Sequence, residues 1–201
     1  MIAAFVLFLR SITGVALKPY ETYRRITERS DTTETAYIGL VCLGYFALAS
    51  LVRAPAFRPF ILTRQFTVLS LSAALGFFLL TWVFWQAGTR LGGRGSFRSV
   101  AVGWGYTLVP TVLWFLVTSL LYIILPPPRT AAVSGILFSI FYLTFSAAML
   151  GWKLLLGYLT LRFSLRIDLV RILGAGSIGA LAIAVYSFVM YRLGIFRIPF
   201  I

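Results

Sequence analysis

Long apolar stretches separated by short polar segments dominate this chain. Five of them are longest, at about residues 32–52, 66–88, 97–125, 131–158 and 169–193. Each exceeds the ~18 apolar residues that mark a membrane-spanning helix and is far longer than the ~10-residue strands of a membrane barrel. The pattern therefore predicts a single-domain, all-α integral membrane protein with five transmembrane helices.

The first 31 residues do not follow this pattern. Residues 1–17 are apolar but carry Arg10 near their middle, where a spanning helix would bury the charge, and no basic residue precedes them as in a signal peptide. We expect a short interfacial helix that ends at Lys18-Pro19. The polar segment Pro19–Arg29 is then either a solvated juxtamembrane helix or a face that docks a partner or lipid headgroups. Asp31 and Glu34 have the spacing of a capping box, which predicts that the first span begins near residue 32.

A basic, glycine-rich turn, Leu91-Gly-Gly-Arg-Gly-Ser-Phe-Arg98, joins the second and third spans. Its three glycines can adopt positive φ angles, and Ser96 can cap the helix that follows, so a tight reversal is expected. Within the third span, Gly103 and Gly105 are unfavourable unless close packing or a bend requires them. Pro110 removes one helical hydrogen bond and predicts a kink.

Composition and charge agree with a membrane protein. The chain is 60% hydrophobic and 11% charged, against roughly 25% charged residues in soluble domains. Its net charge of +13 comes from arginines at the ends of apolar runs, so anionic headgroups explain it better than nucleic acid. Eleven Lys and Arg residues fall on the side of the N-terminus and six on the other, with Lys153 set aside. This predicts that the N-terminus lies inside and the C-terminus outside.

The chemistry available to the chain argues against an enzyme. It has no histidine, a single cysteine (Cys42) and five carboxylates, all on the predicted cytoplasmic side. No carboxylate pair is placed for acid–base catalysis within the membrane, and no metal or cofactor site is predicted. Lys153 lies inside an apolar run, where it either marks a functional pathway or extends its ammonium to the interface.

One glycine motif resembles a nucleotide fingerprint. Gly174, Gly176 and Gly179 match G-x-G-x-x-G, but no predicted strand precedes them and no acidic residue follows Asp168 to hold a ribose. On a membrane helix the same small residues allow another helix to approach closely. We interpret them as a helix-packing face.

Three segments resemble the Yip family, named for Ypt/Rab-interacting proteins, and particularly its short prokaryotic members. They are Pro19-Tyr-Glu-Thr-Tyr-Arg-Arg-Ile26, Leu91-Gly-Gly-Arg-Gly-Ser-Phe-Arg98 and Gly105-Tyr-Thr-Leu-Val-Pro110. The resemblance implies a five-span fold with a cytoplasmic N-terminus, in a prokaryotic cytoplasmic membrane. The long N-terminal region and the acidic-aromatic motif of eukaryotic relatives are not found in this sequence, so binding to Rab-type GTPases is not carried over.

These observations predict a non-enzymatic adapter or accessory subunit in membrane organisation, trafficking or a larger transport complex. Its partners would be anionic headgroups and other membrane-protein subunits, met by polar residues on the cytoplasmic side. The candidate contact residues are Glu21, Arg24, Arg25, Arg90, Arg94 and Arg98. The alternative is a transporter of lipids or small molecules, or a lipid-handling protein, with a cavity near Pro110 and Lys153.

Overall fold

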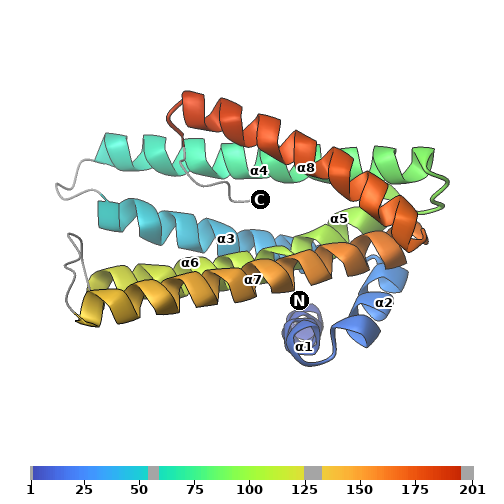
Figure 1. The fold of residues 1–201 in the computed structure, drawn as a ribbon, viewed down its shortest axis with the longest axis horizontal. Coiled ribbons are helices and arrows are strands. Elements are labelled where there is room, and N and C mark those ends of the chain that lie inside the picture. Colours follow the sequence, from blue (N-terminus) through green and yellow to red (C-terminus); the bar gives the residue numbers. More distant parts are fainter. Residues whose placement is uncertain (1, 54–58, 125–132, 196–201) are drawn as a thin grey trace.

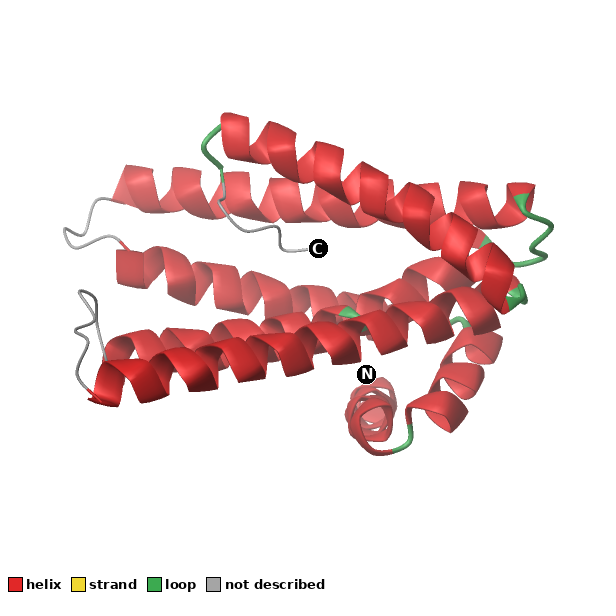
Figure 2. Cartoon of the chain, viewed as in Figure 1, coloured by secondary structure: helices red, strands yellow, loops and turns green. Residues whose placement is uncertain are grey.

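The computed structural model describes residues 2–53, 59–124 and 133–195, and within these ranges every regular element is a helix (Figure 2). The all-α prediction is therefore confirmed. The helices are α1 (Ile2–Leu17), α2 (Pro19–Arg29), α3 (Thr32–Arg53), α4 (Pro59–Arg90), α5 (Phe97–Tyr106), α6 (Leu108–Ile124), α7 (Val133–Leu165) and α8 (Leu169–Arg192).

Four segments of the described chain are long and apolar enough to cross a membrane. They are Arg64–Arg90, Phe97–Tyr122, Val133–Leu165 and Leu169–Arg192. Helix α3 adds 22 residues at the position of the first predicted span. The four segments identify an integral membrane protein, whereas the count of five spans and the orientation in the membrane stay predictions.

The long helices run along a common axis in two groups (Figure 1). Helices α4 and α8 pack together as one group, and α7 packs against α6 in the other, while α3 contacts both α4 and α6. Helix α5 joins the groups at the end where they converge, because it contacts both α4 and α7. Buried Phe84, Trp104 and Leu165 form part of the core at that junction.

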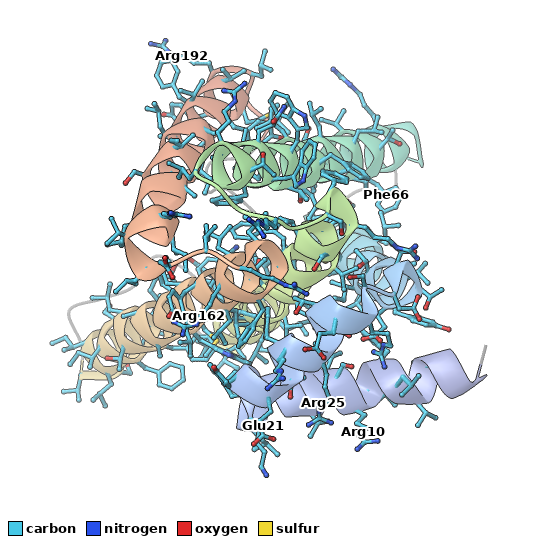
Figure 3. The ribbon with its side chains drawn as sticks, turned by 90° about the vertical axis from the view of Figure 1, so that its right-hand side faces the viewer. Arg10, Glu21, Arg25, Phe66, Arg162 and Arg192 are labelled. Atoms are coloured by element: carbon cyan, nitrogen blue, oxygen red, sulfur yellow. The ribbon has the colours of Figure 1, made fainter. Side chains whose placement is uncertain are left out.

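Helix α1 lies across the bundle. Figure 1 shows it end-on while the long helices run horizontally, and Figure 3 shows it from the side with Arg10 exposed along it. It packs against α2 and α3. This crosswise helix agrees with the predicted interfacial element, although its depth in a bilayer stays a prediction.

The helix predicted across residues 97–125 is two helices rather than one. The break lies at Thr107, three residues before Pro110, which occupies the first turn of α6. Pro110 has no N–H, so no hydrogen bond can form to the Tyr106 carbonyl. A bend at this position therefore breaks no further hydrogen bond. The Thr107 amide and hydroxyl instead both donate to the Trp104 carbonyl, at 3.0 and 2.7 Å.

The glycines of α8 do not form one packing face. A Cβ atom at Gly179 would lie 2.1 Å from Cε1 of Phe84, and one at Gly174 would touch Leu91 at 3.4 Å. At Gly176 a Cβ atom would meet nothing within 4 Å in the described chain. Gly176 therefore has no close neighbour in the described chain, and the packing role predicted for it stays a prediction.

We expect Gly179→Ala to destabilise the protein by about 1–3 kcal/mol, because Phe84 is buried against Trp104 and cannot move freely. Gly176→Ala is the matched control and should be neutral or stabilise by up to ~1 kcal/mol. Thermal unfolding of both variants in detergent measures the difference. Equal melting temperatures would contradict the packing described for Gly179.

Candidate functional site

The arginine-bearing segments of the predicted cytoplasmic side meet at one end of the bundle. This end, called the basic end below, is formed by α2, the glycine-rich turn 91–96 and the connection between α7 and α8 (Figure 3). Two hydrogen bonds secure the turn: the Arg94 amide donates to the Leu165 carbonyl at 3.0 Å, and Trp85 Nε1 donates to the Gly95 carbonyl at 3.2 Å. The turn is therefore attached to both α7 and α4.

The three glycines of this turn serve different purposes. Only Gly92 has a positive φ, of 91°. Gly93 and Gly95 are required by lack of space, since a Cβ atom at Gly95 would lie 1.8 Å from the Ser164 carbonyl oxygen. The prediction of a tight reversal is confirmed. Close approach to α7 explains Gly95, and close approach to the Gly88 carbonyl of α4 and to the end of α7 explains Gly93.

Helix α2 is joined to α5 by hydrogen bonds. The Tyr23 hydroxyl donates to the Gly103 carbonyl at 3.3 Å, and the Ser99 hydroxyl donates to the Thr27 carbonyl at 3.1 Å. The Ser164 hydroxyl continues the chain of contacts onto α7 by donating to the Ser99 carbonyl at 3.0 Å. Burial raises the pKa of Tyr23 far above its usual range, so this hydroxyl stays protonated and remains a donor.

Glu34 is the buried charge at the centre of this junction. Its side chain accepts a hydrogen bond from the Tyr106 hydroxyl and pairs with the Arg29 guanidinium, and the residue is only 1% exposed. The sequence predicted that Glu34 would cap α3, and this is wrong because the carboxylate turns inward to these two partners. Asp31 does cap the helix: the Thr33 amide donates to it at 3.0 Å, which is the main cause of its lowered pKa.

A polar cleft of about 560 Å³ opens between α2, the glycine-rich turn and the α7–α8 connection. Four arginines line it together with two carboxylates: Arg24, Arg94, Arg162, Arg166, Glu28 and Asp168. We call it the basic cleft. Arg24 pairs with Glu28 at 3.2 Å, whereas Arg94 and Arg166 form no ion pair with any carboxylate in the described ranges. Two guanidinium groups are thus available to an anionic ligand.

Only some of the predicted contact residues reach this cleft. Arg24 and Arg94 line it, but Glu21 and Arg25 pair with each other at 3.8 Å outside it. Arg90 ends α4 on an exposed surface, and Arg98 donates to the Thr32 hydroxyl at 3.2 Å. Sequence reasoning missed Arg162 and Arg166 as cleft residues. Both lie between the fourth and fifth predicted spans, on the same predicted side of the membrane as Arg94, and this position could have identified them.

Lys153 lies apart from the basic cleft, half-buried on α7. Its ammonium group donates to the Thr111 hydroxyl on α6 at 2.8 Å. No salt bridge joins it to a carboxylate of the described chain, nor do the described residues hold a cluster of three His, Cys, Asp or Glu side chains for a metal. In this position Lys153 links two helices that also pack through apolar side chains.

A protein-family model covers all three segments that resemble the Yip family. The Yip1 domain model matches residues 13–193, which is nearly the whole chain and includes all three segments. No curated protein and no solved structure matches the sequence.

Proposed function

Since the chain belongs to the Yip1 domain family, which is linked to membrane trafficking, we propose that it is a non-enzymatic adapter that docks an acidic partner protein in the basic cleft. The observation that carries this proposal is the meeting of α2 and the glycine-rich turn in one cleft with unpaired arginines. An adapter needs such a surface rather than a pathway through the bilayer.

The charges of the cleft favour a carboxylate-rich ligand. Four guanidinium groups outnumber the two carboxylates that line it. Arginine binds carboxylates through two parallel hydrogen bonds, and charged hydrogen bonds contribute about 1.5–3 kcal/mol each. The cleft's volume, about 560 Å³, is large enough for several side chains of an acidic segment.

The attachment of the cleft walls supports docking without rearrangement. The glycine-rich turn is bonded to α7 through Arg94 and Leu165, and α2 is bonded to α5 through Tyr23. Walls held in this way keep the backbone of the turn and of α2 in place, which reduces the entropy lost when a partner binds.

Crosslinking in native membranes tests the proposal. We expect Arg94→Ala/Arg166→Ala to reduce the yield of one specific crosslinked partner by about tenfold or more, because two charged contacts are lost. Arg90→Ala/Arg171→Ala is the matched control, since it removes the same charge at the same end but outside the cleft. Arg94→Lys/Arg166→Lys keeps the positive charge without the two parallel hydrogen bonds of arginine, so we expect it to recover only part of the crosslinked partner.

Two results would contradict the adapter. If the control pair loses the partner equally, the attraction is a general one between positive charge and the membrane surface. If Lys153→Ala loses the partner while the cleft variants keep it, the contact lies along α6 and α7 instead. Binding of both double variants to anionic vesicles separates a loss of lipid attraction from a loss of the partner.

A further inference from the structure

A second hollow lies between α3, α4 and the α5–α6 pair, on the membrane-spanning part of the bundle. It measures about 530 Å³. Aromatic and aliphatic side chains form most of its wall, among them Leu43, Phe46, Phe77, Phe78, Trp104 and Phe115. Leu43 and Phe78 are also exposed, so this apolar groove opens to the surroundings of the bundle.

The groove has a positive charge at its basic end. Arg98, Thr32 and Thr35 line it there, where α3 and α5 begin. The Arg98 guanidinium donates one hydrogen bond to the Thr32 hydroxyl at 3.2 Å and forms no salt bridge with a described carboxylate. Asp31 lies close enough for Arg98 to affect its ionisation, but its carboxylate already accepts from the Thr33 amide.

The Thr35 hydroxyl is a second polar group at this end of the groove. Thr35 lines the groove, and its buried hydroxyl oxygen has no hydrogen-bond partner in the described chain, as is also true of the Ser70 hydroxyl farther along the groove. A buried hydroxyl without a partner costs about 1–3 kcal/mol, so such groups normally contact a bound molecule or water. Arg98 and Thr35 together place a free positive charge and a free hydroxyl at one end of an apolar groove.

We propose that this groove binds a phospholipid with an anionic headgroup, its phosphate at Arg98 and Thr35 and one acyl chain along α3 and α4. The site is separate from the basic cleft and does not depend on the adapter function. The lipid comes from the leaflet at the basic end, because that is where the groove's only described arginine lies.

The length of the groove fits one leaflet. Its lining on α3 extends from Thr32 to Phe46, which is ~21 Å along a helix. Half of a ~30 Å hydrocarbon core is ~15 Å, and the remainder reaches into the headgroup layer. A lipid with its phosphate at Arg98 would therefore end its chain near Phe46.

The wall of the groove favours an acyl chain. Its lining is mostly aromatic and aliphatic, and Leu43 and Phe78 are exposed beside it. A flexible chain that enters from the bilayer can follow such a surface. A helix from a partner or from a second copy is an outcome of the test below.

Photocrosslinking of the full-length protein in nanodiscs tests this proposal. The probes are phosphatidylglycerol and phosphatidylcholine with a diazirine in one acyl chain, and labelled residues are located by mass spectrometry. We expect the anionic probe to label α3 and α4 residues of the groove. Arg98→Ala should lower that labelling by about tenfold, the equivalent of one charged contact.

Gly39→Leu blocks the groove directly. Gly39 lines it, and a Cβ atom there would meet nothing within 4 Å, so the leucine enters free space. Gly151→Leu on α7 is the matched control, because it is equally unobstructed but lies outside the groove. We expect Gly39→Leu to abolish groove labelling and Gly151→Leu to leave it unchanged, with both variants keeping the melting temperature of the wild type.

Three results would overturn the proposal. Labelling spread evenly over all lipid-facing helices, and unchanged by Gly39→Leu, would mean that only bulk lipid is present. If both probes label the groove equally and Arg98→Ala does not change that labelling, Arg98 does not bind the lipid phosphate. Crosslinks from groove residues to another protein or a second copy would replace the lipid with a polypeptide. If Gly39→Leu fails to fold, the wild-type labelling pattern and Arg98→Ala decide.

Discussion

Arg29→Ala is expected to destabilise the folded protein by about 3 kcal/mol, because it leaves the buried carboxylate of Glu34 without its counter-ion. Breaking one partner of a buried pair costs about 3–5 kcal/mol, and the lower end applies since the Arg29 side chain is 39% exposed. The loss is measured by thermal or denaturant unfolding in detergent, followed by tryptophan fluorescence.

A second substitution identifies the cause. Glu34→Gln removes the buried charge but keeps an oxygen that can accept from Tyr106, so Arg29→Ala/Glu34→Gln should recover more than half of the lost stability. Arg25→Ala breaks only the exposed pair with Glu21 and should cost less than about 1 kcal/mol. If the double variant is no more stable than Arg29→Ala, Glu34 is not the charge that Arg29 balances.

Gly95→Ala should have an effect of similar size for a different reason. A Cβ atom at this position would overlap the backbone of α7, with Ser164 O at 1.8 Å and the Leu165 Cα at 2.9 Å. Backbone cannot turn aside as a side chain can, so the glycine-rich turn must separate from α7. Overpacking costs about 1–3 kcal/mol, and the hydrogen bonds made by Arg94 and Trp85 add about 1 kcal/mol each.

The matched control for this prediction is Arg94→Ala in the same turn. Its side chain is exposed, and the substitution keeps the backbone amide that donates to Leu165. We expect unfolding of Arg94→Ala to resemble the wild type while Gly95→Ala melts well below it. A Gly95→Ala protein of normal stability would show that the turn does not lie against α7. The comparison also shows whether loss of a partner in Arg94 variants is a binding effect.

The sequence by itself determined the positions of the long helices. Residues 32–52 and 66–88 lie within α3 and α4, and residues 133–158 and 169–192 of the last two predicted spans lie within α7 and α8. A continuous apolar run must satisfy its own backbone hydrogen bonds in lipid, so each run forms one helix. Helices α4 and α7 extend beyond the predicted spans, to Pro59 and to Leu165, because no proline or glycine interrupts the sequence between those residues and the predicted ends. The family was also readable, because its three segments are local motifs.

The residues that could serve function were decided by tertiary structure. Glu34 was expected to cap a helix, and its burial depends on Tyr106, which is 72 positions away in the chain. Gly176 and Gly179 are indistinguishable in a sequence motif, yet only Gly179 faces Phe84. Arg162 and Arg166 line the basic cleft because the end of α7 and the α7–α8 connection lie beside α2. Local pattern determines which segments are helices, whereas the partners of a charge or a glycine depend on how those helices pack against one another.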